Sequence, residues 1–454
     1  MGDVVTGDTG HELRALDGIK VFEFGMAVAS PFAGRNLAAH GADVFKIESP
    51  TSPDIVRLIG SAWLRDNEDL APVVPDSSPY LSELNADKRS VALDVKQAPG
   101  LAAARRLIVE CDVFIANFRA NVLATLGLDY ESVKAIKPDI VYVQLPGFGS
   151  DPELPYYPYM AWGPNQAPLV GIDDLTGHAG REPAGVATVS IPDYYAALHA
   201  TFSVLAGLEH RDQTGESVHV DISQFEATIA LLGPFAMECA LTGHGQSRIG
   251  NRSVWYAPEG VYPCTGHERW IAISCEDDDQ WTALDQLAAQ GWADDERFST
   301  SAARMENVDF LDEAVAGWTS GFANEDLAHR LQARGVAAHI VATNEDLIGD
   351  TQLRERGSFM TRPNVRFKRE IFTSNMHRLT ETPPQNLRGG PSMGEHTVEV
   401  LTEVAGMSEA EVESLIDNNA AFAMNAPDLS VDRPSEEWLH ILFPLEAQDS
   451  RDLA

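Results

Sequence analysis

The feature that most constrains the fold is an alternation of strand-like and helix-like runs between residues 16 and 145. The strand-like runs are short and apolar, and the last of them is rich in β-branched residues. The predicted strands are 19–24, 43–48, 90–94, 113–116 and 139–145, and the predicted helices between them are 31–40 and 100–109. Such an order is typical of parallel strands joined by helical crossovers, so the sequence predicts an open α/β sheet.

The remainder of the chain continues this pattern and then changes. A strand at 186–191 is predicted to lead into a long apolar helix at 194–209, and a further strand is expected at 217–222. A second region begins near Gly243, and a helix pair near the end precedes an acidic tail after Asn418. The sequence therefore predicts a large Rossmann-like domain (1–235), a smaller α+β domain (236–380) and a C-terminal segment (381–454) that returns to the large domain.

Charge and cysteine content limit the class of partner. The 454 residues carry a formal net charge of -35, which disfavours binding to nucleic acid or to an anionic membrane surface. None of the four cysteines forms a CxxC pair, so no metal site is predicted, and a reducing cytoplasm is the expected compartment. Cys111 and Cys239 lie in apolar runs and are predicted to be buried thiols.

Six segments in order carry a resemblance to a known family. They are Leu16–Val21 with Ala29–Ala33 and Gly41–Glu48, Leu84–Ser90, Asp112–Arg119 with Leu126–Tyr130, Gly147–Gly149, Asp193 to Asp221, and Gly394–Leu401. Together they resemble the family III CoA-transferases (the CaiB/BaiF group), which include formyl-CoA transferase and carnitine CoA-transferase. The resemblance implies a Rossmann-like large domain, a smaller domain and an interlocked-ring homodimer, or one half of a heteromeric relative. It also implies acyl-CoA and a carboxylic acid as substrates, with no permanently bound cofactor.

Asp193 is the candidate nucleophile that the resemblance indicates. In the family an Asp at the start of a long apolar helix attacks the acyl-CoA thioester and then carries CoA as a thioester. A helix N-terminus favours the ionised carboxylate, and its N–H groups face developing negative charge. An ordinary helix N-cap is the alternative role for an Asp after Val189-Ser190-Ile191-Pro192.

The same resemblance indicates residues that bind CoA. Val28 and Ala29 lie in the family's active-site loop, and the family's nucleotide-binding segments align with Lys88, Arg89, Asn117, Phe118 and Arg119. Basic side chains suit the CoA phosphates and a loop aromatic suits the adenine. The alternatives are a solvated charge pair for Lys88 and Arg89, and a strand-end cap over a core aromatic for Asn117 and Phe118.

Departures from the family pattern bear on the substrate. Formyl-CoA transferase has Gln where this chain has Val28, which argues against formate or oxalate. Tyr159 and Trp162 lie in a loop expected to line the acyl pocket, with local packing as the alternative, and they suit a larger organic acid. Succinyl-CoA is the expected donor, because family members often use it. A run of glycines found in the second domain of formyl-CoA transferase is missing here.

Two other functions stay open. An α-methylacyl-CoA racemase shares this fold, but it needs an acid/base pair, and the racemases use a His about thirty residues before the matching Asp. No His occurs between His40 and His178 in this chain. The other alternative is a non-catalytic CoA-binding subunit of a heteromeric transferase, against which the retained Asp193 argues.

Overall fold

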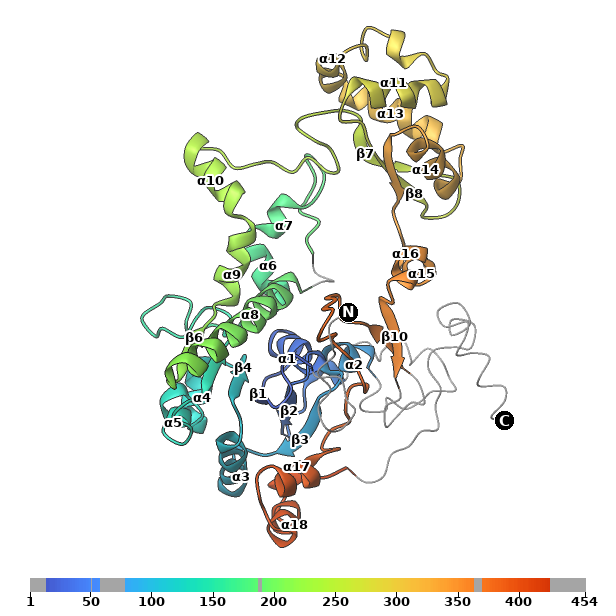
Figure 1. The fold of residues 1–454 in the computed structure, drawn as a ribbon. Coiled ribbons are helices and arrows are strands. Elements are labelled where there is room, and N and C mark those ends of the chain that lie inside the picture. The colour runs from blue at the N-terminus through green and yellow to red at the C-terminus, as the bar shows by residue number, and fades with distance from the viewer. Residues whose placement is uncertain (1–13, 50, 58–77, 187–189, 363–369, 425–454) are drawn as a thin grey trace, which may run out of the picture. The chain divides into compact units, whose positions relative to one another are not determined.

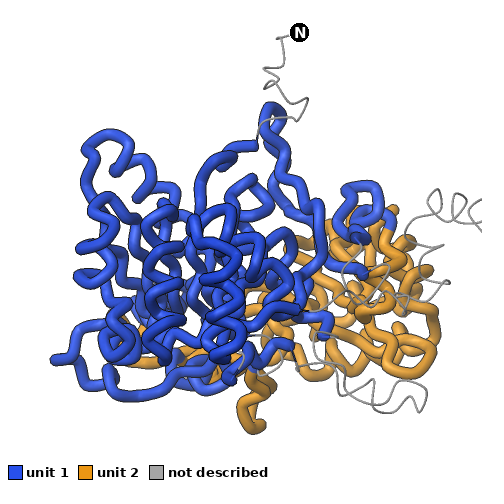
Figure 2. The backbone as a smooth tube through the Cα atoms, turned by 90° about the horizontal axis from the view of Figure 1, so that it is seen from below, with its two compact units in different colours: residues 1–170, 186–238, 351–454 blue, residues 171–185, 239–350 orange. Residues whose placement is uncertain are grey.

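The computed structural model describes residues 14–49, 51–57, 78–186, 190–362 and 370–424 of the chain. The chain divides into two compact units, shown in separate colours in Figure 2. Unit 1 comprises residues 1–170, 186–238 and 351–454, and unit 2 comprises residues 171–185 and 239–350.

Unit 1 is built on a seven-stranded sheet with the order β12-β3-β2-β1-β4-β5-β6 (Figure 1). Its strands are β1 (Lys20–Phe24), β2 (Asp43–Glu48), β3 (Arg89–Leu93), β4 (Val113–Ala116), β5 (Val141–Gln144), β6 (Val218–Asp221) and β12 (Ala421–Phe422). All neighbouring pairs are parallel except β12 with β3. The predicted α/β fold with a mostly parallel sheet is therefore confirmed.

Helices cover both faces of this sheet, because alternate residues of a strand point to opposite sides. Val21 packs in one buried cluster with residues of α1 (Ala29–Ala39) and α8 (Ile191–Thr214). Its neighbour Phe22 packs in the other cluster with residues of α3 (Ala98–Val109), α17 (Thr397–Glu403) and α18 (Glu409–Asp417). Residues from the two ends of the chain thus share one core.

The other elements of unit 1 surround the sheet. They are η1 (Ile55–Arg57), α2 (Pro79–Asn85), α4 (Ala120–Leu126), α5 (Tyr130–Lys134), α6 (Gly163–Leu169), α9 (Gln224–Leu231), α10 (Gly233–Thr242, which continues into unit 2), α16 (Thr351–Glu355), and the antiparallel strands β10 (Phe359–Arg362) and β11 (Glu370–Thr373).

Unit 2 has a three-stranded antiparallel sheet, β7 (Glu259–Pro263), β8 (Trp270–Ser274) and β9 (Ala337–Ile340), in that order. Its helices are α7 (Ile172–Leu175), α11 (Asp278–Ala288), η4 (Trp292–Asp294), α12 (Ser301–Glu306), α13 (Val308–Thr319), α14 (Asn324–Gln332) and α15 (Asn344–Gly349). Trp281 and Leu331 lie in its core, where residues of α11 and α14 meet the sheet.

The strands and helices predicted between residues 16 and 145 are confirmed, with ends that differ by one or two residues. The strand predicted at 186–191 is wrong where the structure describes it, because Ser190 is the N-cap of α8 and Ile191 is the first residue of that helix. Residues 187–189 lie outside the described residues. The chain after Asn418 does not begin a tail at once, because Ala420 and Ala421 are buried and β12 extends the sheet; residues 425–454 lie outside the described part.

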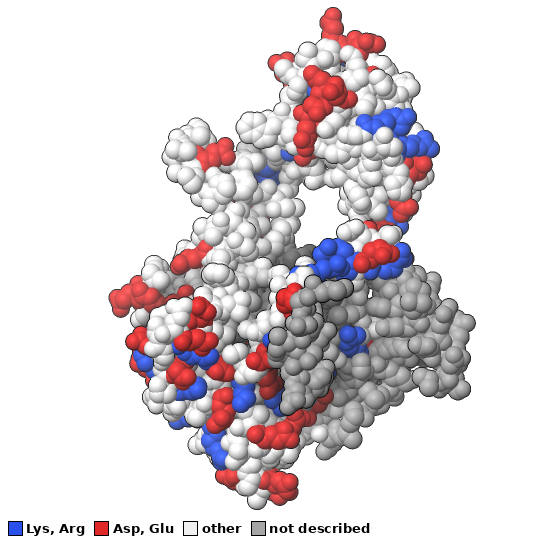
Figure 3. Space-filling view, in the orientation of Figure 1, with Lys and Arg blue, Asp and Glu red and all other residues white. Residues whose placement is uncertain are grey.

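The helices α8, α9 and α10 expose apolar side chains. Phe202 of α8, Met237 of α10 and Leu241 of α10 are exposed, Leu241 to 83%, and α10 buries none of its residues. In Figure 3 the surface over α9 and α10 carries few charged atoms. Cys111 is buried as predicted, whereas the prediction for Cys239 is wrong, because it lies on the exposed α10.

No single helix in the described ranges is long and apolar enough to cross a membrane. The pair α9 and α10, bent by 68°, meets that criterion jointly by length and composition.

Candidate active site

A cavity of about 750 Å³ lies within unit 1, where chain segments leave the carboxyl ends of the sheet strands. Six residues named from the sequence line it, which are Val28, Asn117, Phe118, Arg119, Trp162 and Asp193. Further lining residues come from η1 and α2 (Ile55, Val56, Tyr80), from the segment around α6 (Met160, Gly163) and from α8 and α9 (Ser190, Tyr194, Gln224). The sequence therefore identified a set of residues that the fold brings together.

Asp193 lies in the first turn of α8 and is 8% exposed. The Ser190 hydroxyl donates a hydrogen bond to its Oδ2 atom, and its own N–H donates to the Ser190 carbonyl at 3.1 Å. Burial raises the pKa of the Asp193 carboxyl, and the Ser190 hydrogen bond opposes that rise. The site thus holds a desolvated carboxylate, which is a better nucleophile than a fully hydrated one, at the positive end of a 24-residue helix.

The segment that enters α6 comes very close to this carboxylate. A Cβ atom on Gly163 would collide with both the Ser190 hydroxyl and Asp193 Oδ2. A side chain at position 163 would therefore displace the Ser190 and Asp193 side chains from the places they occupy. Gly163 therefore allows the backbone before α6 to form a wall of the cavity beside the candidate nucleophile.

The loop from Gly25 to Val28 forms another part of the lining, and its backbone is held by side chains. Asn117 accepts a hydrogen bond from Met26 N at 3.0 Å and donates one to Met26 O at 2.7 Å. Asp54 Oδ1 accepts from Ala27 N at 2.8 Å. Ala27 has φ 59°, a left-handed conformation that a non-glycine residue adopts only when its surroundings impose it.

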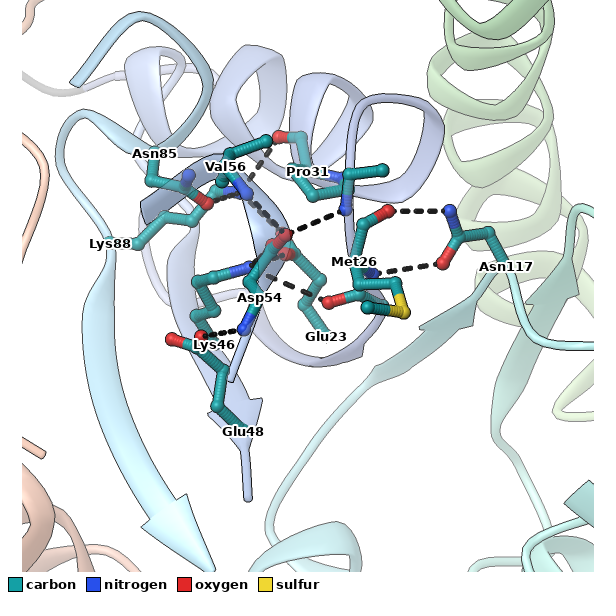
Figure 4. Close-up of polar contacts among 12 residues, drawn as sticks. Glu23, Met26, Pro31, Lys46, Glu48, Asp54, Val56, Asn85, Lys88 and Asn117 are labelled. Atoms are coloured by element: carbon teal, nitrogen blue, oxygen red, sulfur yellow. Dashed lines mark hydrogen bonds and ion pairs between the residues drawn. The ribbon is translucent and has the colours of Figure 1, made fainter. Parts of the chain in front are cut away.

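Beneath this loop lies a fully buried cluster of charged groups (Figure 4). Glu23 and Lys46 are partners in register on the parallel strands β1 and β2. Lys88 Nζ lies 2.7 Å from Glu23 Oε2, while Lys46 Nζ lies 3.8 Å from Glu23 Oε1 and 2.8 Å from Asp54 Oδ2. Two positive and two negative groups therefore balance one another away from solvent, as buried charges require.

Lys88 and Arg89 do not line the cavity. Lys88 is buried, its Nζ donates to Pro31 O at 2.7 Å and to Asn85 Oδ1 at 2.9 Å, and burial lowers its pKa to about 8. The alternative of a solvated Lys88 is wrong. Arg89 pairs with Asp43 and Glu399, with its guanidinium 4.8 Å from the Phe45 ring centroid. Contact of Lys88 and Arg89 with CoA phosphates stays a prediction.

The loop after β4 places Phe118 and Arg119 on the cavity. The Phe118 ring packs on Phe24, with ring centroids 4.7 Å apart, so part of it belongs to the core. Arg119 donates to Pro158 O at 3.0 Å and is the only Lys or Arg among the described residues that line the cavity. Ala29, the first residue of α1, is buried in the core and does not line the cavity.

The aromatic loop before α6 divides between surface and cavity. Trp162 is 42% exposed and lines the cavity, whereas Tyr159 is 59% exposed and contacts Tyr156 at 6.1 Å between ring centroids. The role of Tyr159 in an acyl pocket stays a prediction.

Several residues of the site were not named from the sequence, among them Glu23, Lys46, Asp54, Gly163 and Ser190. A signal existed for Glu23 and Lys46, because each is a charged residue inside an otherwise apolar strand run. Opposite charges at matching places in two adjacent buried strands indicate a paired internal site. Gly163 gave no such signal, since its role depends on a contact with the distant Asp193.

Comparison with known proteins places this arrangement in a family. The model of CoA-transferase family III matches residues 16–397. The succinyl-CoA–D-citramalate CoA-transferase of Chloroflexus aurantiacus is 30% identical over 403 residues, which cover 88% of this chain and 97% of that protein. The succinyl-CoA–L-malate CoA-transferase alpha subunit of Chloroflexus aurantiacus is 27% identical over 411 residues, covering 90% of this chain and 93% of that one.

A solved structure agrees with these matches. A CaiB/BaiF family protein from Brucella suis superimposes with a TM-score of 0.79 at 30% identity, covering 87% of this chain and 100% of that chain. The described residues that line the cavity include no His, the residue that the racemases of this fold use together with the matching Asp. The chain therefore belongs to CoA-transferase family III and is a CoA-transferase.

Proposed function

We propose that Asp193 is the nucleophile of this transferase. A carboxylate oxygen of Asp193 attacks the acyl carbon of the donor thioester, and the CoA thiolate leaves as a mixed anhydride forms. The thiolate then attacks the aspartyl carbonyl carbon, which releases the donor acid and leaves CoA on Asp193 as a thioester. The observation that carries this proposal is a buried carboxylate on the cavity with a raised pKa and a single hydroxyl donor, Ser190.

The second half of the reaction reverses the first. The acceptor carboxylate attacks the aspartyl thioester and expels the thiolate. The thiolate attacks the acyl carbon of the new mixed anhydride, so the acceptor leaves as its CoA thioester and the Asp193 carboxylate is regenerated. The α8 N-terminus stabilises the ionised carboxylate at the start and at the end of this cycle.

Succinyl-CoA is the proposed donor, and an organic acid larger than formate or oxalate is the proposed acceptor. Support for the donor comes from the names of the Chloroflexus aurantiacus relatives. Support for the acceptor comes from Val28 and Trp162, which give the cavity apolar walls. Arg119 is the proposed contact of the CoA phosphates, with Phe118 beside the adenine.

The test is a transfer assay with the purified chain. We expect succinyl-CoA together with citramalate, malate or glutarate to yield the new CoA thioester and succinate, detected by mass spectrometry. Asp193→Asn should abolish transfer, and Asp221→Asn, which alters a carboxylate that binds Ser150 outside the cavity lining, should not. Proton exchange at the acyl α-carbon without transfer would indicate a racemase instead.

We also propose that the chain assembles with a second copy of itself. The exposed apolar residues of α8 to α10, such as Phe202 and Met237, suit burial against another protein surface. Light scattering at several protein concentrations should give the mass of a dimer. A monomer that gains activity only with a second, different chain would support the heteromeric alternative, which the alpha-subunit relative illustrates.

A further inference from the structure

The strongest unassigned feature is the connection between the buried charge cluster and the loop that lines the cavity. Asp54, which is 2% exposed, takes part in both. Its Oδ2 accepts from Lys46 Nζ at 2.8 Å, and its Oδ1 accepts from Ala27 N at 2.8 Å and from Val56 N at 3.2 Å. Ala27 and Val56 both line the cavity, on two separate segments. One carboxylate thus links two parts of the cavity wall to the sheet.

The cluster also holds the flanks of the same loop. Lys46 Nζ lies 3.5 Å from Gly25 O, where β1 ends, and Lys88 Nζ lies 2.7 Å from Pro31 O in the first turn of α1. With Asn117 on Met26, every residue from Gly25 to Ala27 therefore has a backbone atom bound by a buried or half-buried side chain (Figure 4).

We propose that Asp54 is a positioning residue of the transfer reaction, which holds Ala27 in its left-handed conformation and thereby sets where Met26 and Val28 stand on the cavity that contains Asp193. The proposal rests on Asp193 being the nucleophile. Lys46 and Lys88 lie against the carboxylates of Asp54 and Glu23, so the buried charges of the cluster compensate one another, and burial lowers the pKa of Lys88 to about 8.

Energetics support a positioning role over a purely stabilising one. A buried charge network adds little net stability compared with apolar residues of the same volume, because desolvation offsets the attraction. An alanine in the left-handed region is strained, so the loop will relax if its acceptor is removed. Relaxation would rotate the peptide between Ala27 and Val28 and displace the start of α1.

Two double variants isolate the hydrogen bond from the charge. Lys46→Met with Asp54→Asn removes one charge of each sign and keeps an oxygen acceptor for Ala27 N. Lys46→Met with Asp54→Ala removes the same charges and the acceptor as well. Asp285→Ala is the matched control in unit 2, because that buried carboxylate also accepts from two backbone N–H groups, Trp292 N at 2.8 Å and Ala293 N at 3.1 Å.

The assay measures the loading of Asp193 by succinyl-CoA in the full chain, where hydroxylamine displaces the bound thiolate or donor acid and converts the activated Asp193 carboxyl into a hydroxamate. It yields the rate of loading and the final number of loaded Asp193 residues per chain. We expect equal loading stoichiometry in both double variants, and a loading rate that is about 10–100-fold lower in the Ala double variant than in the Asn one, as when a buried N–H group loses its acceptor. The Asp285→Ala control should load at the wild-type rate.

Other outcomes overturn the inference. Equal rates in the two double variants would show that the Ala27 contact does not matter, and a reduced stoichiometry at an unchanged rate would show a folding role only. If the Ala double variant does not fold, the variants Ala27→Val and Ala27→Gly test the loop directly. Valine disfavours a positive φ and glycine accepts it, so the Val variant should load more slowly than the Gly variant. Equal loading rates of these two variants would overturn the inference. A wild type that transfers CoA without loading Asp193 would refute the proposed nucleophile instead.

Discussion

In a plot of kcat/KM for succinyl-CoA loading against pH, the fall in activity at low pH is the acid limb. Replacement of Ser190 by Ala should move this acid limb to higher pH. The Ser190 hydroxyl is the side chain that donates to Asp193, whose carboxyl already has a pKa raised by burial. A hydrogen bond to a charged group contributes about 1.5–3 kcal/mol, and one pKa unit corresponds to about 1.4 kcal/mol. Loss of the donor should therefore raise the pKa of Asp193 further, because the ionised carboxylate loses a stabilisation of that size.

The sign follows from which form reacts. Only the ionised carboxylate attacks the thioester, so activity falls as the pH drops through the pKa of Asp193. Because the variant has the higher pKa, its loss begins at higher pH, while the rates above both pKa values should differ little. The measurement is kcat/KM for succinyl-CoA loading against pH, which reports the groups of the free enzyme.

Ser408→Ala is the matched control for this experiment. Ser408 donates to Glu411 at 2.9 Å with the same three-residue spacing at the start of α18, outside the cavity lining. Its acid limb should coincide with that of the wild type. An unshifted acid limb in Ser190→Ala, in a protein with wild-type loading stoichiometry, would refute the reasoning that the serine controls the ionisation of Asp193.

Three further variants test other parts of the account. Asp193→Asn should abolish loading. It should also raise the melting temperature near neutral pH, as measured by calorimetry. The pKa of Asp193 is raised in the folded protein, so this carboxyl favours folding at low pH, where it is protonated, and disfavours folding at neutral pH, where it must ionise. Gly163→Ala should slow loading by about 100-fold or more, since its Cβ meets Asp193, whereas Gly317→Ala, with open space around it, should not. Lys88→Met should destabilise the fold by about 3–5 kcal/mol, and addition of Glu23→Gln should recover much of this in denaturant titrations.

The alternating pattern was sufficient to predict the parallel sheet, because short, mostly apolar runs such as Val113–Ala116 alternate with helix-forming sequence. The antiparallel strand Ala421–Phe422 could not be predicted in this way. It has two residues, and it is a strand only because Gly394 and β3 leave an edge that it can pair with. Local sequence carries no information about such a distant partner.

The candidate site shows the same division. The position of Asp193 at the start of a long apolar helix was readable, since Pro192 and Gly215 are typical of helix starts and ends. The environment of Lys88 was not. A lysine beside an arginine in a loop-like segment suggests solvent, whereas Glu23, more than sixty positions earlier, draws it into the interior. Pairing across strands decides which charges are buried, and pairing depends on the sheet order.

The proposed role of Asp193 as nucleophile is tested most directly by finding which residue carries the covalent intermediate. The wild-type chain is incubated with succinyl-CoA, treated with hydroxylamine, digested and mapped by mass spectrometry. We expect a hydroxamate on Asp193 that requires succinyl-CoA and is missing in Asp193→Asn. A hydroxamate on another residue, or none on Asp193 in protein that transfers CoA, would contradict it.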